Sequence, residues 1–113
     1  MIEASCHCGG VRFAVEAAPE KVTECNCSIC RRNGTLWAYY QPPQVRFAVG
    51  NGPTDVCMWG DRELELNRCR TCGCVTHWSA VDRAYQRMGV NARLMPPEVL
   101  AAIPVSHFDG AAM

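Results

Sequence analysis

The amino-acid sequence predicts an all-β domain of short antiparallel strands. Apolar and polar residues alternate in several short segments, which is the pattern of half-buried strands. Gly, Pro, Asn and Asp residues interrupt these segments at intervals of roughly 8 to 12 residues, as turns do in all-β domains. Helix-start signals occur in one short segment near the C-terminus. The length of 113 residues suits a single domain, residues 1–113, with a modest core.

The strands are predicted in order along the chain. Residues 11–16 alternate between apolar and polar side chains. Residues 35–40 are aromatic and β-favouring. Trp37, Tyr39 and Tyr40 could line a pocket, but we expect them in the strand core. The later predicted strands cover residues 45–49, 55–59, 62–67, 75–80 and 85–91. Turn residues at 50–53 and 60–61 separate three of them.

One short helix is predicted near the C-terminus. It begins at Pro96-Pro97-Glu98, because proline is tolerated in the first turn of a helix, where its missing N–H would have no partner. Pro104 follows a few residues later and limits the length of this helix. The expected fold therefore contains at most this one short helix.

The overall composition narrows the class of partner. Eleven basic and 11 acidic residues balance each other, which argues against a nucleic-acid-binding surface. The sequence has no run of about 18 apolar residues, so we expect no membrane span. The first ten residues, "MIEASCHCGG", lack the basic and apolar regions of an export signal. We therefore expect a cytoplasmic protein without nucleic-acid or membrane partners.

Nine cysteines are the main chemical feature of the chain. They include a C-x-C pair (Cys6, Cys8), a C-x-C-x-x-C triple within residues 25–30 and a C-x-x-C pair (Cys69, Cys72). The odd count and the missing export signal argue against a secreted disulfide scaffold. The spacings typical of iron–sulfur proteins, C-x-x-C-x-x-C and C-x4-C-x-x-C, are absent. The pattern therefore predicts bound zinc.

The number of ligands suggests how the cysteines divide. Structural zinc is nearly always held by four protein ligands. The two outlying pairs supply four, namely Cys6, Cys8, Cys69 and Cys72. The triple, Cys25, Cys27 and Cys30, then has three. Spacing alone also permits a fourth ligand for the triple, from Cys57, Cys74, His7 or His77.

A zinc ion with three thiolates and one open position has the pattern of a catalytic site. Zinc accepts soft sulfur ligands, so a substrate thiol is the expected fourth ligand. Arg31 and Arg32 directly follow the triple and are candidates for binding a substrate carboxylate. Ser28 is either a hydrogen-bond donor to a zinc-bound sulfur or a simple turn residue. His77 is a candidate proton shuttle.

Three motifs together resemble the glutathione-dependent formaldehyde-activating enzyme family, also called the centromere protein V/GFA domain. They are "SCHCGGVRF", "CNCSICRRNG" and "CRTCG", in the order and spacing of that family. The resemblance implies a β-tent fold and two zinc ions per chain. It implies a structural zinc on the two outlying pairs and a catalytic zinc on the triple. The activity that it implies is S-hydroxymethylglutathione synthesis, which is carbon–sulfur lyase chemistry in the reverse direction.

These observations predict an enzyme. A small thiol such as glutathione would bind at the open zinc position, lose its proton there and attack a small aldehyde, for which formaldehyde is the example in the family. The alternative is a zinc-stapled module without catalysis that binds a protein or serves as a scaffold. The number of metal ions, and the ease with which one is removed, would separate the two hypotheses.

Overall fold

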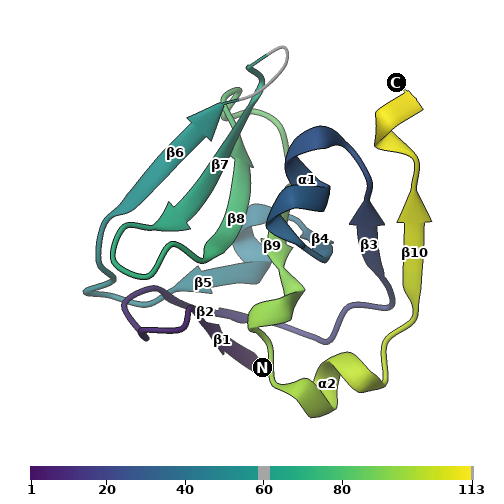
Figure 1. Ribbon diagram of the computed structural model, residues 1–113. Coiled ribbons are helices and arrows are strands. Elements are labelled where there is room, and N and C mark those ends of the chain that lie inside the picture. Colours follow the sequence, from purple (N-terminus) through teal and green to yellow (C-terminus); the bar gives the residue numbers. More distant parts are fainter. Residues whose placement is uncertain (59–61, 113) are drawn as a thin grey trace.

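Figure 1 shows the computed structural model, which describes residues 1–58 and 62–112 as two β-sheets connected by turns and short helices. The smaller sheet has three strands, β1 (Ile2–Ser5), β2 (Arg12–Val15) and β5 (Val45–Phe47). The larger sheet has seven, in the order β10-β3-β4-β9-β8-β7-β6. They are β3 (Val22–Cys25), β4 (Trp37–Tyr40), β6 (Thr54–Met58), β7 (Leu64–Cys69), β8 (Val75–Ala80), β9 (Met88–Asn91) and β10 (Val105–Phe108). The prediction of an all-β domain is confirmed.

Antiparallel pairing connects the strands of both sheets, except at one edge of the larger sheet. There β10 runs parallel to β3, with Val105 opposite Val22 and Phe108 opposite Cys25. β1, β3 and β10, of four residues each, were not predicted from the sequence. In β3 (VTEC) and β10 (VSHF), apolar and polar residues do not alternate. The parallel β10–β3 pair brings the C-terminal residues beside the cysteine triple.

The structure contains a second short helix that the sequence did not predict. α1 (Ser28–Asn33) follows directly from the cysteine triple, whereas α2 (Pro97–Ala101) is the expected helix near the C-terminus. The Cys27 sulfur caps α1 by accepting from the backbone N–H of Cys30, and Gly34, with φ 65°, ends it in the left-handed conformation. Cysteine is not a usual helix cap, which is why sequence signals for α1 were weak. The short 3-10 helices are η1 (Pro42–Gln44), η2 (Ala92–Leu94) and η3 (Gly110–Ala112).

Strand boundaries differ from the prediction at several places. The strand expected at residues 85–91 begins only at Met88, since residues 81–87 form a loop. The strand expected at residues 55–59 begins at Thr54. Trp59 and the turn expected at Gly60 and Asp61 lie outside the described residues.

The main hydrophobic core involves one face of the larger sheet and the smaller sheet. It contains Ala38 and Tyr40 of β4, whose neighbours Trp37 and Tyr39 point to the opposite face. Its other buried members are Ala4, Phe13, Val15, Val22, Leu36, Val45, Met88, Val90, Ala92 and Met95. The larger sheet bends, so that β6, β7 and β8 stand on one side and β3 and β10 on the other (Figure 1). Among the helices of the described residues, none is long and apolar enough to cross a lipid bilayer.

The opposite face of the larger sheet carries a second cluster, formed by Trp37, Val75 and Trp78. Gly89 on β9 makes room for the Trp78 ring, because a Cβ at Gly89 would lie 2.1 Å from the indole Nε1. Cys30 and Tyr39 pack against this aromatic cluster. The strand-core prediction for Trp37 and Tyr40 thus agrees with their burial, whereas Tyr39 is half-exposed at the edge of this cluster.

Candidate metal centres

The two outlying cysteine pairs meet in space. Their four sulfurs, which we call the four-cysteine cluster, lie within 4.8 Å of one another and belong to Cys6, Cys8, Cys69 and Cys72. The Cys8 sulfur lies 3.6 Å from the Cys6 sulfur and 3.6 Å from the Cys69 sulfur. A zinc ion with Zn–S bonds of about 2.3 Å in a tetrahedron separates its sulfurs by about 3.8 Å. The spacing and the all-sulfur donor set therefore fit a tetrahedral zinc ion.

Two glycine turns shape the four-cysteine cluster. Gly9, with φ 76°, and Gly73, with φ 80°, adopt the left-handed conformation, and each donates its N–H to the carbonyl of the first cysteine of its pair. Backbone N–H groups also point at sulfur, since Val11 donates to Cys6 Sγ at 3.3 Å. The backbone N–H of Cys74 is the main cause that lowers the pKa of the Cys72 thiol to about 5. These donors stabilise thiolates, which is the form that binds a metal.

The triple forms a second group of sulfurs, which we call the three-cysteine cluster. The sulfurs of Cys25, Cys27 and Cys30 lie within 4.8 Å of one another, and all three residues are half-buried. Cys25 ends β3, Cys27 caps α1 and Cys30 lies within α1. Two donors hold the sulfurs, since Cys30 N–H donates to Cys27 Sγ at 3.5 Å and the Trp37 indole donates to Cys30 Sγ at 3.4 Å. Within the described residues, no His, Asp, Glu or fourth Cys belongs to this group.

The surrounding protein groups shift the pKa values of the Cys27 and Cys30 thiols in opposite directions. Burial is the main cause that raises the pKa of the Cys30 thiol to about 12. Burial also acts to raise the pKa of Cys27, but hydrogen bonds from Cys30 and other groups outweigh it and the pKa is lowered. A divalent cation among the three sulfurs would favour the thiolate at each position. The donor set therefore suits a soft, thiolate-binding metal such as zinc.

The other possible ligands of the triple lie elsewhere, and His7 is exposed between Cys6 and Cys8 of the four-cysteine cluster. Cys74 packs against the four-cysteine cluster, and Cys57 lies on β6. The His77 ring lies 4.6 Å from the Phe47 ring, measured between centroids, and Thr76 Oγ1 lies 2.9 Å from its Nδ1. Because alternate residues of β8 point to opposite faces, His77 faces away from Trp78 and the three-cysteine cluster. Its position gives no support to the predicted proton shuttle.

The residues predicted to bind substrate lie on α1. Ser28 is its first residue, and Arg31 and Arg32 are exposed in its last turn. Positive charge at that end of a helix interacts favourably with the helix dipole. Arg32 Nη1 donates to the Ser28 carbonyl at 2.9 Å. All three share the helix of Cys30 and lie on the side of the molecule that carries the three-cysteine cluster.

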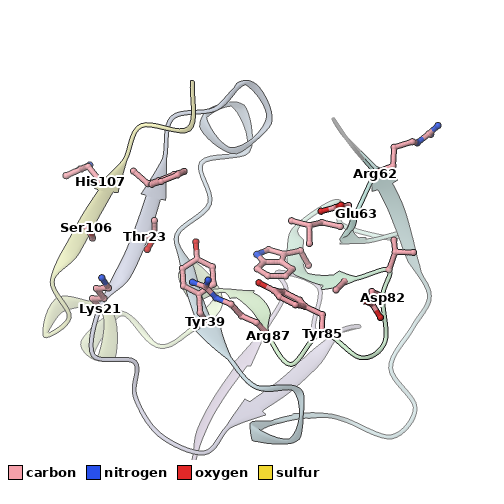
Figure 2. Close-up of a pocket in the computed structure, with 15 residues that line it drawn as sticks. Lys21, Thr23, Tyr39, Arg62, Glu63, Asp82, Tyr85, Arg87, Ser106 and His107 are labelled. Carbon is pink, nitrogen blue, oxygen red and sulfur yellow. The ribbon is translucent and has the colours of Figure 1, made fainter. Parts of the chain in front are cut away.

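A groove of about 860 Å³ lies on the face of the larger sheet that carries the Trp37 and Trp78 cluster. Figure 2 shows Lys21, Thr23, Ser106 and His107 on one wall and Arg62, Glu63 and Asp82 on the other. Tyr39, Arg87 and Tyr85 lie between them. Trp78 also lines the groove. The groove thus combines aromatic surface with several charged side chains of both signs.

The groove adjoins the three-cysteine cluster. Thr23 lines it and lies two residues before Cys25 on the same face of β3. Tyr39 lines it and lies two residues after Trp37, whose indole donates to Cys30. The Arg87 guanidinium stacks on the Tyr39 ring, 4.0 Å from its centroid. The groove and the three-cysteine cluster thus share neighbouring residues of β3 and β4, with Arg87 at the groove side.

Sequence reasoning missed the residues that support the three-cysteine cluster from outside the motif. The sequence pattern predicted Trp37 in the strand core, because it contains no sign that the indole N–H donates to a sulfur. Arg87 lies in a segment expected to be strand, and its place over Tyr39 depends on the fold. The only available signal was the concentration of aromatic residues at 37–40, which allowed a pocket as well as a core.

Comparisons with known proteins agree with this architecture. The family model described as "Glutathione-dependent formaldehyde-activating enzyme" matches residues 1–103. The chain is also similar to a Rhodobacter sphaeroides protein solved by crystallography as a structural genomics target. The two are 30% identical with a TM-score of 0.74, and the match covers 93% of this chain and 100% of the other.

Proposed function

Because the chain belongs to the glutathione-dependent formaldehyde-activating enzyme family, we propose that it is a zinc-dependent carbon–sulfur lyase for adducts of a glutathione-type thiol and a small aldehyde. In the synthetic direction the thiol sulfur attacks the aldehyde carbon. A carbon–sulfur bond forms as the carbonyl π bond breaks, and the proton lost by the thiol ends on the former carbonyl oxygen. The lyase direction reverses these changes and needs no oxidant or reductant.

The observation that carries this proposal is the three-cysteine cluster beside a groove. Three cysteine sulfurs converge without a fourth protein donor in the described part of the chain. The adjoining groove of about 860 Å³ can hold a tripeptide-sized molecule. Bound by Cys25, Cys27 and Cys30, zinc would supply the positive charge that holds a substrate sulfur as a thiolate. The four-cysteine cluster, with its full set of ligands, would hold a second, structural zinc.

The residues of the chain have separate tasks in this proposal. Trp37 and the Cys30 N–H orient the ligand sulfurs through their hydrogen bonds. Arg87 and Lys21 bind carboxylates of the thiol within the groove. The Tyr39 hydroxyl donates a hydrogen bond to the aldehyde oxygen. Arg31 and Arg32 remain candidates for a substrate carboxylate outside the groove, because both are exposed on α1.

Calorimetric titration with glutathione tests the thiol site. We expect the zinc-loaded protein to bind glutathione with a dissociation constant of roughly 1 μM to 1 mM, the usual range for substrates. The variant Cys27→Ser should lose this binding. Cys57→Ser is the matched control, since Cys57 lies on β6 and belongs to neither cluster. S-methylglutathione should bind much more weakly, because its sulfur cannot become a thiolate and only its carboxylates would contact Arg87 and Lys21.

Exchange between formaldehyde, glutathione and the adduct, followed by NMR, tests the reaction. The wild-type protein should accelerate the exchange, and Arg87→Ala should weaken glutathione binding more than Arg31→Ala does. Unchanged glutathione binding in Cys27→Ser would contradict the thiol site. Two tightly held metal ions together with no glutathione binding would favour the alternative, a zinc-stapled scaffold module.

Free thiolates also bear on where the protein would act. Both clusters need reduced cysteines, and cytosolic glutathione and thioredoxin keep thiols reduced. A cytoplasmic location, in contact with the thiol pool that would provide the substrate, is part of the proposal.

A further inference from the structure

The C-terminal residues after α2 return to the three-cysteine cluster. β10 pairs with β3 in a register that sets Phe108 opposite Cys25. The backbone N–H of Asn26 then donates to the Phe108 carbonyl at 3.2 Å. Figure 1 shows β10 beside β3, with the C-terminal turn following it past the end of β3. Residues 108–112, which we call the C-terminal strap, thus lie beside the start of the cysteine motif.

Asn26 holds the strap with both ends of its side-chain amide. Its Nδ2 donates to Asp109 Oδ1 at 2.9 Å, and its Oδ1 accepts from the Ala111 N–H at 2.9 Å. The Ala112 N–H donates to the Asp109 carbonyl at 3.3 Å and closes the turn. Because Asn26 stands between Cys25 and Cys27, the segment that carries two sulfurs also carries the attachment of the strap.

Gly110 brings the strap against the sulfurs. A Cβ at this position would lie 2.5 Å from Cys25 Sγ and 3.2 Å from Cys27 Cβ. The φ angle of Gly110 is not in the left-handed region, so the close approach, and not the backbone conformation, calls for glycine here. The strap backbone therefore lies against the Cys25 side of the three-cysteine cluster, where even a methyl group at Gly110 would collide with the sulfur.

We propose that the C-terminal strap closes one side of the three-cysteine site and so limits the path of ligands to its metal to the groove. Asn26 is the positioning residue that holds the strap in place. Phe108 belongs to both features, because it begins the strap and lines the groove. The inference rests on the metal site of the proposed function but not on its reaction.

Release of zinc to the chromogenic chelator 4-(2-pyridylazo)resorcinol tests the strap without any thiol or aldehyde. We expect a fast phase from the three-cysteine site and a slow phase from the four-cysteine site, assigned with Cys27→Ser, which should lack the fast phase. Asp109→Ala should accelerate the fast phase roughly 2- to 10-fold, as expected for the loss of one hydrogen bond. Asp109→Asn, which keeps an oxygen acceptor, should release zinc at the wild-type rate.

Gly110→Ala gives an independent variant. Its new Cβ should displace the strap or Cys25, so we expect faster zinc release and a changed sulfur-to-metal charge-transfer band when cobalt replaces zinc. Gly52→Ala is the matched control, because a Cβ there would meet its nearest neighbour, the Gly10 carbonyl, at an ordinary 3.6 Å. Gln44→Ala is a second control, since it removes a side-chain acceptor, for the Gln41 N–H at 2.8 Å, outside both the strap and the groove.

Three results would overturn the inference. The first is an unchanged fast phase in both Asp109→Ala and Gly110→Ala. The second is equal acceleration of both phases, which would indicate general destabilisation of the fold. The third is equal acceleration by Asp109→Asn and Asp109→Ala, because the hydrogen bond from Asn26 would then be irrelevant. Zinc release can be measured whether or not the protein has lyase activity. A negative result for the strap can therefore be told apart from a negative result for the proposed reaction.

Discussion

The four-cysteine cluster joins two turns that lie far apart in the chain, whereas the three-cysteine cluster is contained within residues 25–30. Cys8 and Cys69 are 61 positions apart, so a metal between them ties the loop after β1 to the turn after β7. The three-cysteine cluster follows one strand into one helix, and its remaining contacts come from Trp37 and the C-terminal strap. The four-cysteine cluster connects distant segments of the fold, and the three-cysteine cluster holds half-buried sulfurs near its surface. Under the proposed function, the same donor atom would serve stability in one place and chemistry in the other.

The largest effect should separate the two clusters by stability. Cys69→Ser should prevent stable folding, because structural zinc contributes on the order of 10 kcal/mol to folding. Cys27→Ser should remain folded with one zinc in place of two. The substitution leaves the backbone hydrogen bonds of α1 and the pairing of β3 with β4 and β10 in place. Circular dichroism melts and metal analysis of both variants check this expectation. Equal loss of structure in the two would mean that both sites are structural.

Low pH should act on the stability of the fold through His77 and on metal binding through the cysteine thiolates. Burial lowers the pKa of His77 from 6.5 to about 4, so below pH 6.5 the unfolded chain binds a proton that the native chain does not. Stability should therefore fall as pH drops from 6.5 to 4, by up to about 3 kcal/mol from this group. Low pH also protonates cluster thiolates and releases metal. His77→Gln should flatten only the first contribution, which urea unfolding at several pH values measures as a smaller slope.

The Trp37 indole provides a test confined to the three-cysteine cluster. Trp37→Phe removes the donor to Cys30 Sγ and keeps an aromatic ring in the cluster with Trp78. Loss of such an outer hydrogen bond typically weakens metal binding about 10- to 100-fold. We expect this loss at one zinc of the two, in competition with a calibrated chelator. Equal weakening of both zincs would show that the tryptophan acts through the fold as a whole.

The smallest effect concerns the surface beside the four-cysteine cluster. Arg70 Nε lies 3.0 Å from Asp55 Oδ1, with side chains 59% and 39% exposed. Exposed pairs of this kind contribute less than about 1 kcal/mol. Arg70→Ala should therefore shift the unfolding midpoint little and leave both zincs bound. A large loss of stability would mean that the turn depends on its ion pair as well as on its sulfurs.

The sequence predicted the β class and most of the strands of the larger sheet, because alternation and turn residues are local signals. It missed α1, since the helix starts from a cysteine cap, and it missed β10, whose pairing with β3 is a contact between distant segments. The division of the cysteines was open to several fourth ligands from spacing alone. The structure brings the four outlying sulfurs together and places Cys57, Cys74 and His77 elsewhere.

The sequence by itself determined which sulfurs meet within each cysteine motif, and the fold decided that the two outlying pairs come together. Ligands two or three positions apart on a tight turn meet through local backbone geometry, which the spacing already contains. Only the tertiary structure decided what surrounds the three sulfurs. Asn26 and Asp109 are 83 positions apart, and their contact depends on the register of β10 with β3. The indole of Trp37, the guanidinium of Arg87 and the backbone of Gly110 reach the site through sheet order and packing, for which local spacing holds no information.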